Sequence, residues 1–184
     1  MKSFDYIFIG FGASTALLLR SLQRYGRLED KRVAIIDPDL SKGNDKTFCF
    51  WSEDTDPVFR DNKDLIDKSW SNIRVDNLDT EALAPLRYHH IESIRLYRRT
   101  KEMLKRYDIT WIEAPVTDVT ANKDLATIHW AHGKAQSNQV FDSRPAPFVR
   151  DEKHPFLWQS FIGYRVKVNR PVFDTEVYHK MDFQ

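Results

Sequence analysis

The chain opens with two apolar segments separated by a stretch of helical periodicity. Residues 4–9 form a short apolar run, which predicts a strand buried on both faces, as in a parallel sheet. Residues 13–25 predict an amphipathic helix because their leucines gather on one face, and Gly26 is placed to end it. Residues 32–37 predict a second buried strand. Together these segments predict a β-α-β unit with parallel strands and a right-handed crossover.

Further along, the pattern predicts one more helix and several short strands. Residues 90–107 place apolar side chains at helical spacing, with arginines and lysines on the other face. Residues 54–83 are polar and poorly periodic, which indicates an excursion from the β-α-β unit. Residues 140–145 predict a strand that runs into a polar turn and returns beside Gly10. The other predicted strands are residues 70–75, 109–113, 116–120, 126–130, 134–140, 158–168 and 180–183, with turns at 122–124 and 132–133.

These elements predict an α/β fold, a Rossmann-like domain whose parallel sheet continues into a β-meander. We expect this domain over residues 1–150, with an excursion at about residues 44–88. Residues 151–184 are expected to begin a mixed-sheet domain that binds the substrate. No residues follow the last predicted strand to complete its sheet. We therefore expect the sequence to be the N-terminal portion of a longer protein.

A glycine turn joins the first strand to the first helix, with the sequence Gly10-Phe11-Gly12-Ala13-Ser14-Thr15. The first glycine permits the turn, and the second lets a pyrophosphate approach the backbone. The helix N-terminus behind the turn favours negative charge. The third small position, for which glycine or alanine is typical, holds Thr15. Because a strand precedes the turn and a helix follows it, the pattern favours a dinucleotide site over a chance turn.

Asp37 ends the second predicted strand, more than 20 residues after the glycines. An acidic side chain in this place accepts hydrogen bonds from the 2′- and 3′-hydroxyls of a ribose. It would also repel a 2′-phosphate, which argues against NADP. The alternative is a loop aspartate that simply precedes Pro38. With the glycine turn upstream, the ribose role is the favoured interpretation.

A polar loop over residues 41–47 leads into an aromatic block of Phe48, Phe50 and Trp51. In an α/β fold this loop follows the second strand, near the edge of the sheet where ligands bind, so it is placed to cover a ligand. The alternative is a surface loop with aromatic side chains packed beneath it. Cys49 is interpreted as a small packed side chain, because the sequence identifies no acid–base partner for it.

Composition narrows the function classes only slightly. The net charge of +1 gives no electrostatic case for nucleic acid binding, and the single cysteine excludes an internal disulfide. No apolar run approaches the roughly 20 residues that span a bilayer. The abundant aromatic residues are interpreted as core side chains, with an aromatic-lined pocket as the alternative. His129 and His132 resemble a ligand pair, but no third ligand is evident.

Seven short blocks occur in one order along nearly the whole chain. They cover residues 9–13, 36–38, 46–51, 141–145, 159–163, 170–174 and 181–183. In this order they resemble the bacterial lycopene β-cyclases of the flavin-dependent carotenoid cyclase family, over about the first half of a family member. The glycine turn is generic to flavoproteins. The Gln-Ser-Phe-Ile-Gly block at 159–163 and the Met-Asp-Phe block at 181–183 are more discriminating.

The resemblance implies a flavoprotein that closes β-ionone rings at the ends of a linear, lycopene-like carotene. It implies FAD in its reduced form as the cofactor, with NAD(P)H as a candidate electron donor. The enzyme class would be an intramolecular lyase or isomerase that works by acid-catalysed, redox-neutral isomerisation. Nothing in the chain matches the acidic family motif Phe-Leu-Glu-Glu-Thr, so no catalytic residue is assigned. We expect that motif, and a second flavin-binding glycine motif, after Gln184.

The residues expected to bind FAD come from the glycine turn, the ends of the predicted strands and the loop before the aromatic block. They are Gly10, Gly12, Ala13, Ser14, Thr15, Asp37, Pro38, Thr47, Asp142, Ser143 and Arg144. No metal site and no nucleic acid partner are expected. Because a carotene dissolves in the bilayer, a cytoplasmic protein with peripheral membrane contact is expected. The basic face of residues 90–107 is interpreted as a solvated surface, with membrane attraction as the alternative.

Two other functions fit the same residues. The first is another FAD-dependent oxidoreductase of this fold, such as a monooxygenase or a carotenoid-type dehydrogenase. The second is a nucleotide-binding module that has lost its activity. Cyclisation leaves the mass of the substrate unchanged, whereas oxidation or oxygen insertion alters it, and an inactive module without a flavin site would take up no flavin.

Overall fold

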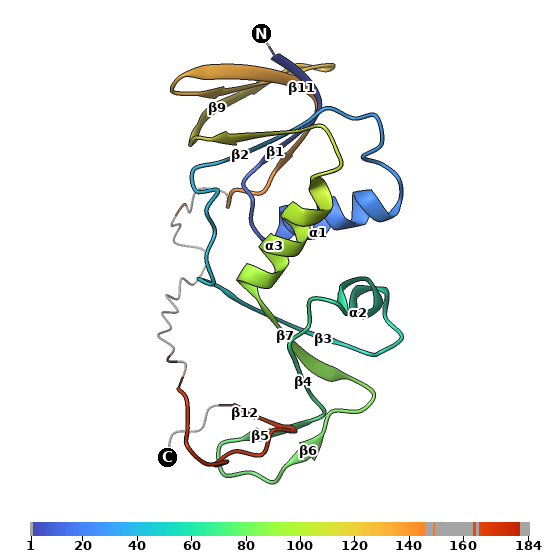
Figure 1. Cartoon of the computed structure of the whole chain (residues 1–184), viewed down its shortest axis with the longest axis vertical. Coiled ribbons are helices and arrows are strands. Elements are labelled where there is room, and N and C mark those ends of the chain that lie inside the picture. The colour runs from blue at the N-terminus through green and yellow to red at the C-terminus, as the bar shows by residue number, and fades with distance from the viewer. Residues whose placement is uncertain (1, 146–148, 150–163, 165, 181–184) are drawn as a thin grey trace.

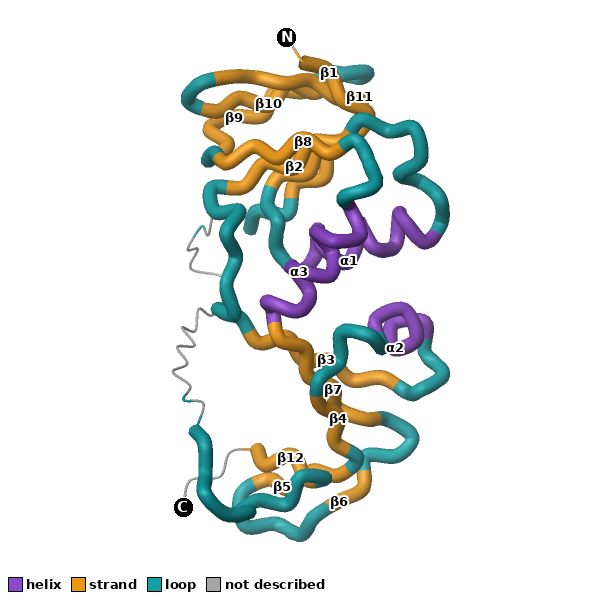
Figure 2. Tube along the Cα trace, viewed as in Figure 1, coloured by secondary structure: helices purple, strands orange, loops and turns teal. Residues whose placement is uncertain are grey.

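Two regions follow one another along the long axis of the molecule (Figures 1 and 2). In one region, helices α1 (Ala13–Arg24) and α3 (Ser93–Leu104) lie beside a six-stranded sheet. In the other, the short helix α2 (Pro57–Asn62) accompanies two three-stranded sheets. The computed structural model describes residues 2–145, 149, 164 and 166–180. Among these residues, no helix combines the length and apolar character needed to cross a membrane.

The large sheet has the strand order β8-β2-β1-β11-β10-β9. Its strands are β1 (Lys2–Ile9), β2 (Val33–Asp37), β8 (Ile109–Glu113), β9 (Val116–Ala121), β10 (Ala126–Trp130) and β11 (Gly133–Asp142). Strands β8, β2, β1 and β11 run parallel, and β10 and β9 continue the sheet in antiparallel fashion. The predicted α/β class, a parallel sheet with a β-meander, is therefore confirmed. The segments predicted as strands 134–140 and 140–145 form one strand, β11.

The central strands of this sheet are buried on both faces. All five residues of β2 are buried, and β1 directs alternate side chains to opposite faces. Phe8 belongs to the apolar core formed with α1 and α3, whereas Ile7 and Ile9 belong to a second core that includes Ile128 of β10. Each fully buried side chain of this size contributes about 1.5–3 kcal/mol to stability. The carboxyl ends of the parallel strands are thereby held in fixed positions.

The chain between β2 and α3 forms the two small sheets together with β12 (Val177–Lys180). One sheet has the order β3-β7-β4, and its strands are β3 (Thr47–Ser52), β7 (Arg87–Glu92) and β4 (Lys68–Trp70). The other has the order β12-β5-β6, with β5 (Asn72–Val75) and β6 (Glu81–Ala82). The β3-β7-β4 sheet lies below α3, into which β7 leads directly (Figure 1). Most of these strands lie within the excursion expected at about residues 44–88, but β7 extends to Glu92 and β12 comes from the C-terminal part of the chain. The domain bounds, including the division at residue 150, stay predictions.

Two predicted elements are wrong in extent. The helix predicted over residues 90–107 begins at Ser93, because His90 and Ile91 pair with β3 and complete β7. The strand predicted over residues 70–75 is divided at Ser71 into β4 and β5, which belong to different sheets. The strand predicted over residues 158–168 lies almost wholly outside the described residues. Of the last predicted strand, residues 180–183, only Lys180 is described, and it ends β12.

Candidate functional site

The turn after β1 holds the ends of three parallel strands together. Gly10 has a φ of +89°, a conformation that favours glycine, and its N–H donates to the carbonyl oxygen of Ile36 at 2.8 Å. From the other side, the N–H and Oγ of Ser143 each donate to the carbonyl oxygen of Ile9 at 2.9 Å. A Cβ on Gly10 would lie 2.5 Å from Ser143 Oγ. Glycine is therefore required here, and residues 140–145 return beside the turn as predicted.

Gly12 begins α1 without a side chain that caps the helix. Its φ of −90° is accessible to any residue, and a Cβ built there would meet nothing within 4 Å. No acidic residue lies in the first turn, and the first intrahelical bond runs from Ala16 N–H to the carbonyl oxygen of Gly12 at 3.0 Å. The N–H groups before Ala16 thus have no helical partner, and the helix dipole adds positive potential. In proteins that bind phosphate groups, a helix N-terminus of this kind is the local structure that does so.

Thr15 occupies the close contact between α1 and the sheet. Its side chain is buried, with 2% exposed, and its Oγ1 donates to Ser143 Oγ at 3.3 Å. The hydroxyl therefore bonds to the end of β11 at the position where the sequence pattern usually has glycine or alanine. Thr15 is therefore placed to position α1, and it is not among the residues that line the cavity described below.

Asp37 lies at the end of β2, directly beside the glycine turn, and is 5% exposed. Its Oδ2 accepts the N–H of Phe11 at 2.6 Å. Its Oδ1 accepts the N–H of Asp39 at 2.8 Å and forms an ion pair of 2.9 Å with Lys42 Nζ. The carboxylate thus locks the turn to the strand end. The role of Asp37 toward a ribose stays a prediction. In that role, the ribose hydroxyls donate to Oδ1, either together with Lys42 Nζ or in its place.

A cavity of about 390 Å³ extends from the glycine turn along the ends of β2 and β11. Six predicted residues line it, namely Gly10, Gly12, Asp37, Pro38, Ser143 and Arg144. Lys42, Asp45 and Lys46 also line it and come from the loop at residues 41–47 that was expected to cover a ligand. The lining residues not predicted are Ile9, Ile36, Tyr97, Pro115, Val116 and Pro145. Pro115 and Val116 follow β8, so the rule that ligands bind at the carboxyl ends of parallel strands would have found them. Tyr97 comes from α3, and no sequence signal indicates it.

Arg144 and Tyr97 are two polar residues in the wall of this cavity. Arg144 holds the Asp142 carboxylate with Nε at 2.9 Å from Oδ1 and Nη2 at 2.7 Å from Oδ2, and these hydrogen bonds lower the pKa of Asp142. Arg144 Nη1 also donates to the carbonyl oxygen of Val116 at 3.1 Å. Burial, followed by the charges of Asp45 and Asp37, raises the pKa of Tyr97. Asp142 therefore orients Arg144, and Tyr97 presents a neutral phenol.

The other predicted residues lie near the turn but outside this cavity. Ser14 is exposed at the start of α1. Ala13 and Thr47 line a separate, mostly apolar cavity of about 340 Å³ between α1 and β3. Phe48 and Phe50 of β3 pack against the main core, whereas Trp51 of the same aromatic block is exposed.

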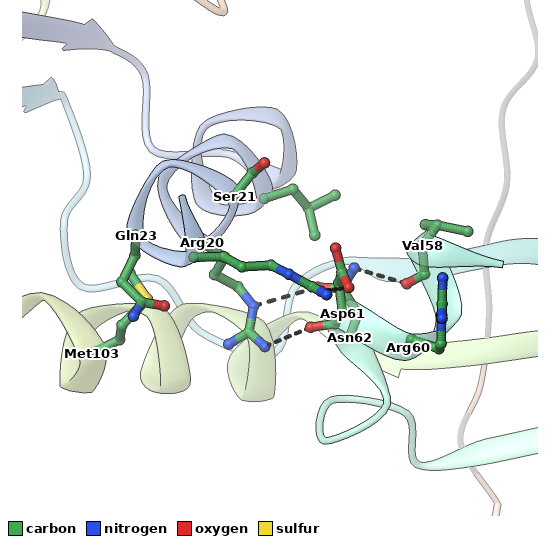
Figure 3. A pocket seen from close by; sticks show the side chains of 10 residues that line it. Arg20, Ser21, Gln23, Val58, Arg60, Asp61, Asn62 and Met103 are labelled. Atoms are coloured by element: carbon green, nitrogen blue, oxygen red, sulfur yellow. Dashed lines mark hydrogen bonds and ion pairs between the residues drawn. The ribbon is translucent and has the colours of Figure 1, made fainter. Parts of the chain in front are cut away.

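A larger cavity, of about 530 Å³, lies away from the glycine turn between α1 and α2 (Figure 3). Arg20 spans it and donates to Asn62 Oδ1 at 3.3 Å and to the carbonyl oxygen of Asp61 at 3.2 Å. Asn62 Nδ2 in turn donates to the carbonyl oxygen of Val58 at 3.0 Å. Because these polar groups satisfy one another, we assign the cavity a structural role in joining α2 to α1.

The geometry around the glycine turn fits a dinucleotide. It combines open N–H groups at a helix N-terminus, a buried carboxylate at the end of β2, and two lysines in the cavity wall. Within the described residues, no group of three or more His, Cys, Asp or Glu side chains is placed to hold a metal ion.

The family model described as lycopene cyclase protein matches residues 5–184. The chain belongs to the lycopene cyclase family. This finding confirms the resemblance indicated by the seven sequence blocks. The lycopene cyclase match includes the glycine turn, Asp37 and Ser143. No curated protein sequence matches the chain.

Solved structures of flavoenzymes share the fold of this lycopene cyclase family chain. p-Nitrophenol 4-monooxygenase PnpA from Pseudomonas putida is 12% identical, with a TM-score of 0.57 over 77% of this chain and 41% of PnpA. NikD, an unusual amino acid oxidase in nikkomycin biosynthesis, is 10% identical, with a TM-score of 0.56 over 78% of this chain and 51% of NikD. CtdE in complex with FAD is 13% identical, with a TM-score of 0.53 over 77% of this chain and 38% of CtdE. The chain thus spans about two fifths to one half of the length of these proteins.

Proposed function

We propose that the chain is the FAD-binding portion of a lycopene β-cyclase. The observation that carries this proposal is the family match over residues 5–184, on a chain whose glycine turn and buried carboxylate fit a dinucleotide. The FAD bound in the similar structure of CtdE supports FAD as the cofactor. Because the chain spans only part of the structures it matches, the activity of the whole protein is part of the proposal.

In the proposed complex, residues of this chain bind and orient the cofactor. The open N–H groups at the start of α1 bind the pyrophosphate, which approaches over Gly12 because no side chain stands there. Asp37 accepts hydrogen bonds from the ribose hydroxyls. Gly10 and Ser143 hold the strand ends in register beneath them. Pro38 and Arg144, which line the same cavity, supply further contacts, together with the exposed Ser14 at the start of α1. Asp142 positions Arg144, and Thr15 positions α1.

The proposed reaction is the redox-neutral isomerisation of a linear carotene. A proton adds to a double bond of the end group, a neighbouring double bond attacks the resulting cation, and proton loss leaves the β-ionone ring. Reduced FAD, when bound, supplies an anionic, electron-rich group that stabilises the positive charge. The acid that starts the reaction is a carboxyl group in an apolar pocket, where desolvation raises its pKa. We assign it to no residue of this chain.

Two further parts of the proposal concern the surroundings of the enzyme. NAD(P)H supplies the electrons that keep FAD reduced. The protein works on the cytoplasmic side of the membrane and touches it peripherally, because its apolar substrate partitions into the bilayer.

The test uses the purified protein that contains this sequence, with reduced FAD and lycopene in phospholipid vesicles. We expect carotenes with one or two β-ionone rings, separated by chromatography and equal in mass to lycopene. Lycopene that stays linear under these conditions contradicts the proposal. Omission of the reductant is the control, and it should abolish the product without releasing FAD.

The likeness to PnpA favours a second candidate, an FAD-dependent monooxygenase. The same incubation separates the two functions, because oxygen insertion raises the mass of the carotene and consumes oxygen. Loss of hydrogen from the carotene would instead indicate a dehydrogenase. Protein that gains no flavin on titration would indicate an inactive nucleotide-binding module.

A further inference from the structure

One face of the β3-β7-β4 sheet carries an aromatic residue on every strand. Trp51 of β3 lies opposite Tyr88 of β7, and Tyr88 lies opposite Trp70 of β4. The ring centroids are 4.4 Å apart for Trp51 and Tyr88, and 5.9 Å apart for Trp70 and Tyr88. Tyr178 of β12 adds a fourth ring at 4.5 Å from Tyr88. We call Trp51, Tyr88, Trp70 and Tyr178 the aromatic row.

The opposite face of the same sheet supplies the hydrophobic packing. Phe50 packs against the main core, and Ile91 and His89 are buried. His89 Nδ1 lies 2.7 Å from Ser69 Oγ on this face. The aromatic row therefore lies on the side of the sheet away from the main core. Trp51, at one end of the row, is 43% exposed.

Next to the aromatic row lies an imidazole held by a carboxylate. His90 is two residues along β7 from Tyr88, on the same face, and its Nδ1 lies 2.9 Å from both carboxylate oxygens of Asp67. An ionised carboxylate only accepts hydrogen bonds, so Nδ1 carries the hydrogen and Nε2 keeps a lone pair. The pair is thus arranged so that Nε2 takes a proton and Asp67 stabilises the resulting charge.

The loop before this face borders the cavity around the glycine turn. Thr47 and Glu92 form the pair of the β3-β7 ladder nearest α3. The loop before β3 is fixed to α3, because Ser93 Oγ accepts the N–H of Lys46 at 3.1 Å and donates to the carbonyl oxygen of Gly43 at 3.2 Å. Lys46 lines the cavity around the glycine turn. At about 3.4 Å per residue, His90 lies about 7 Å, and Tyr88 about 14 Å, along β7 from Glu92.

We propose that this face binds the linear polyene, with the aromatic row against its conjugated chain and His90 beside the reacting end group. The inference rests on the proposed function. Aromatic faces pack well against a flat conjugated chain and attract positive charge. In the last step, the C–H bond next to the cationic carbon breaks, its electron pair forms the ring double bond, and the proton moves to His90 Nε2. This proton balances the one added in the first step, and His90 returns it to solvent.

Replacement of His90 tests the proton transfer in the complete protein with reduced FAD and lycopene vesicles. In His90→Gln, we expect cyclisation to slow about 100-fold or more, while bound FAD stays at the wild-type level. Without His90, the cation should lose its proton from another carbon, which yields other ring isomers. Alternatively, water should capture the cation, which yields a product heavier by one water. A purely structural role would not change the products. His132→Gln, at an exposed position before β11, is the matched control and should behave as wild type.

Replacement of Trp51 tests the aromatic row independently of the reaction. Lycopene retained after gel filtration by the complete protein with oxidised FAD should fall about fivefold or more in Trp51→Leu and recover in Trp51→Phe. Tyr25→Leu, at a position 69% exposed on another surface, should retain lycopene normally. A lower melting temperature with unchanged lycopene binding would overturn the inference and make the row a packing feature. If the wild type binds lycopene through the aromatic row but does not cyclise it, the proposed function is wrong, whereas the inference that this face binds a polyene is supported.

Discussion

Thr15 Oγ1 donates a hydrogen bond of 3.3 Å to Ser143 Oγ, across 128 positions of the sequence. Ser143 Oγ in turn donates to the carbonyl oxygen of Ile9 at 2.9 Å. These two bonds join α1, β11 and β1 at the point where the dinucleotide is proposed to bind. The departure from the glycine pattern at Thr15 therefore adds a contact at the helix–sheet junction.

Removal of the Thr15 hydroxyl tests this contact. Thr15→Val keeps the shape of the side chain, and Ser143 keeps its bond to Ile9, so we expect the free energy of unfolding to fall by about 0.5–1.5 kcal/mol. Urea unfolding of Thr15→Val, Ser143→Ala and the double variant measures the coupling between the two hydroxyls. Additive effects would contradict a direct interaction. Thr55→Val, at an exposed position, is the control.

The two glycines of the turn have separable roles. Gly10→Ala places a methyl group against Ser143 Oγ at a positive φ, so we expect about 1–3 kcal/mol of lost stability together with weaker FAD binding. Gly12→Ala meets open space at a permitted φ, so folding should be unaffected while the methyl group obstructs the pyrophosphate. Chemical unfolding and flavin fluorescence titration measure the two effects. Equal FAD affinity in Gly12→Ala and wild type would argue against a close approach at Gly12.

The buried carboxylate of Asp37 should matter for both folding and cofactor affinity. Asp37→Asn removes the charge that pairs with Lys42 and leaves one acceptor oxygen for two backbone donors, so we expect about 1–3 kcal/mol of destabilisation. FAD affinity should fall about tenfold or more, because a charged acceptor for the ribose is lost. Isothermal titration with FAD gives the affinity. Asp39→Asn, on the exposed side of the same loop, should bind FAD as the wild type does.

Stability should depend on pH through His89. Burial, with the charge of Arg87 adding to it, lowers the pKa of this fully buried imidazole from its usual 6.5. The unfolded chain then binds the proton at a higher pH than the folded chain does. The stability from neutral His89 is therefore complete above about pH 6.5 and is lost as the pH falls through the folded pKa. Urea unfolding between about pH 7.5 and 5 should show this decline, and His89→Gln should flatten it. A decline that is equally steep in His89→Gln would implicate other groups, and His132→Gln should keep the wild-type slope.

The elements with the strongest local patterns were predictable from the sequence. The apolar runs of β1 and β2 and the leucine face of α1 predict the positions of these elements to within about two residues. The strands are short continuous apolar runs and the helix has apolar residues at helical spacing, so each pattern indicates one type of element. His90 to Glu92 were assigned to a helix because apolar positions at helical spacing continue through them. Their conformation is set by pairing with β3 and β4. These pairings are long-range contacts, which the periodicity of the sequence does not predict.

The candidate site was predictable where one segment carries the signal, and Ser143 and Arg144 were expected from the family resemblance. Gly10, Gly12 and Asp37 follow from a pattern within a single β-α-β unit. Lys42 and Tyr97 enter the cavity from a loop and from α3, and their side-chain directions depend on how those elements pack. The aromatic row escaped the sequence analysis for the same reason. Its members lie on four strands, and only the register of the sheets brings them together.

The order β3-β7-β4 has a consequence for handling the protein. Among the described residues β3 pairs only with β7, so its other edge presents unpaired N–H and C=O groups. The strand reads Thr-Phe-Cys-Phe-Trp-Ser, six residues without a charge, a proline or a glycine. Such an edge recruits strands of other molecules and promotes aggregation. A charge on this strand would oppose such pairing, but the exposed Cys49 lies opposite His90, on the face proposed to bind the polyene, so a lysine there would protect the edge and obstruct that face.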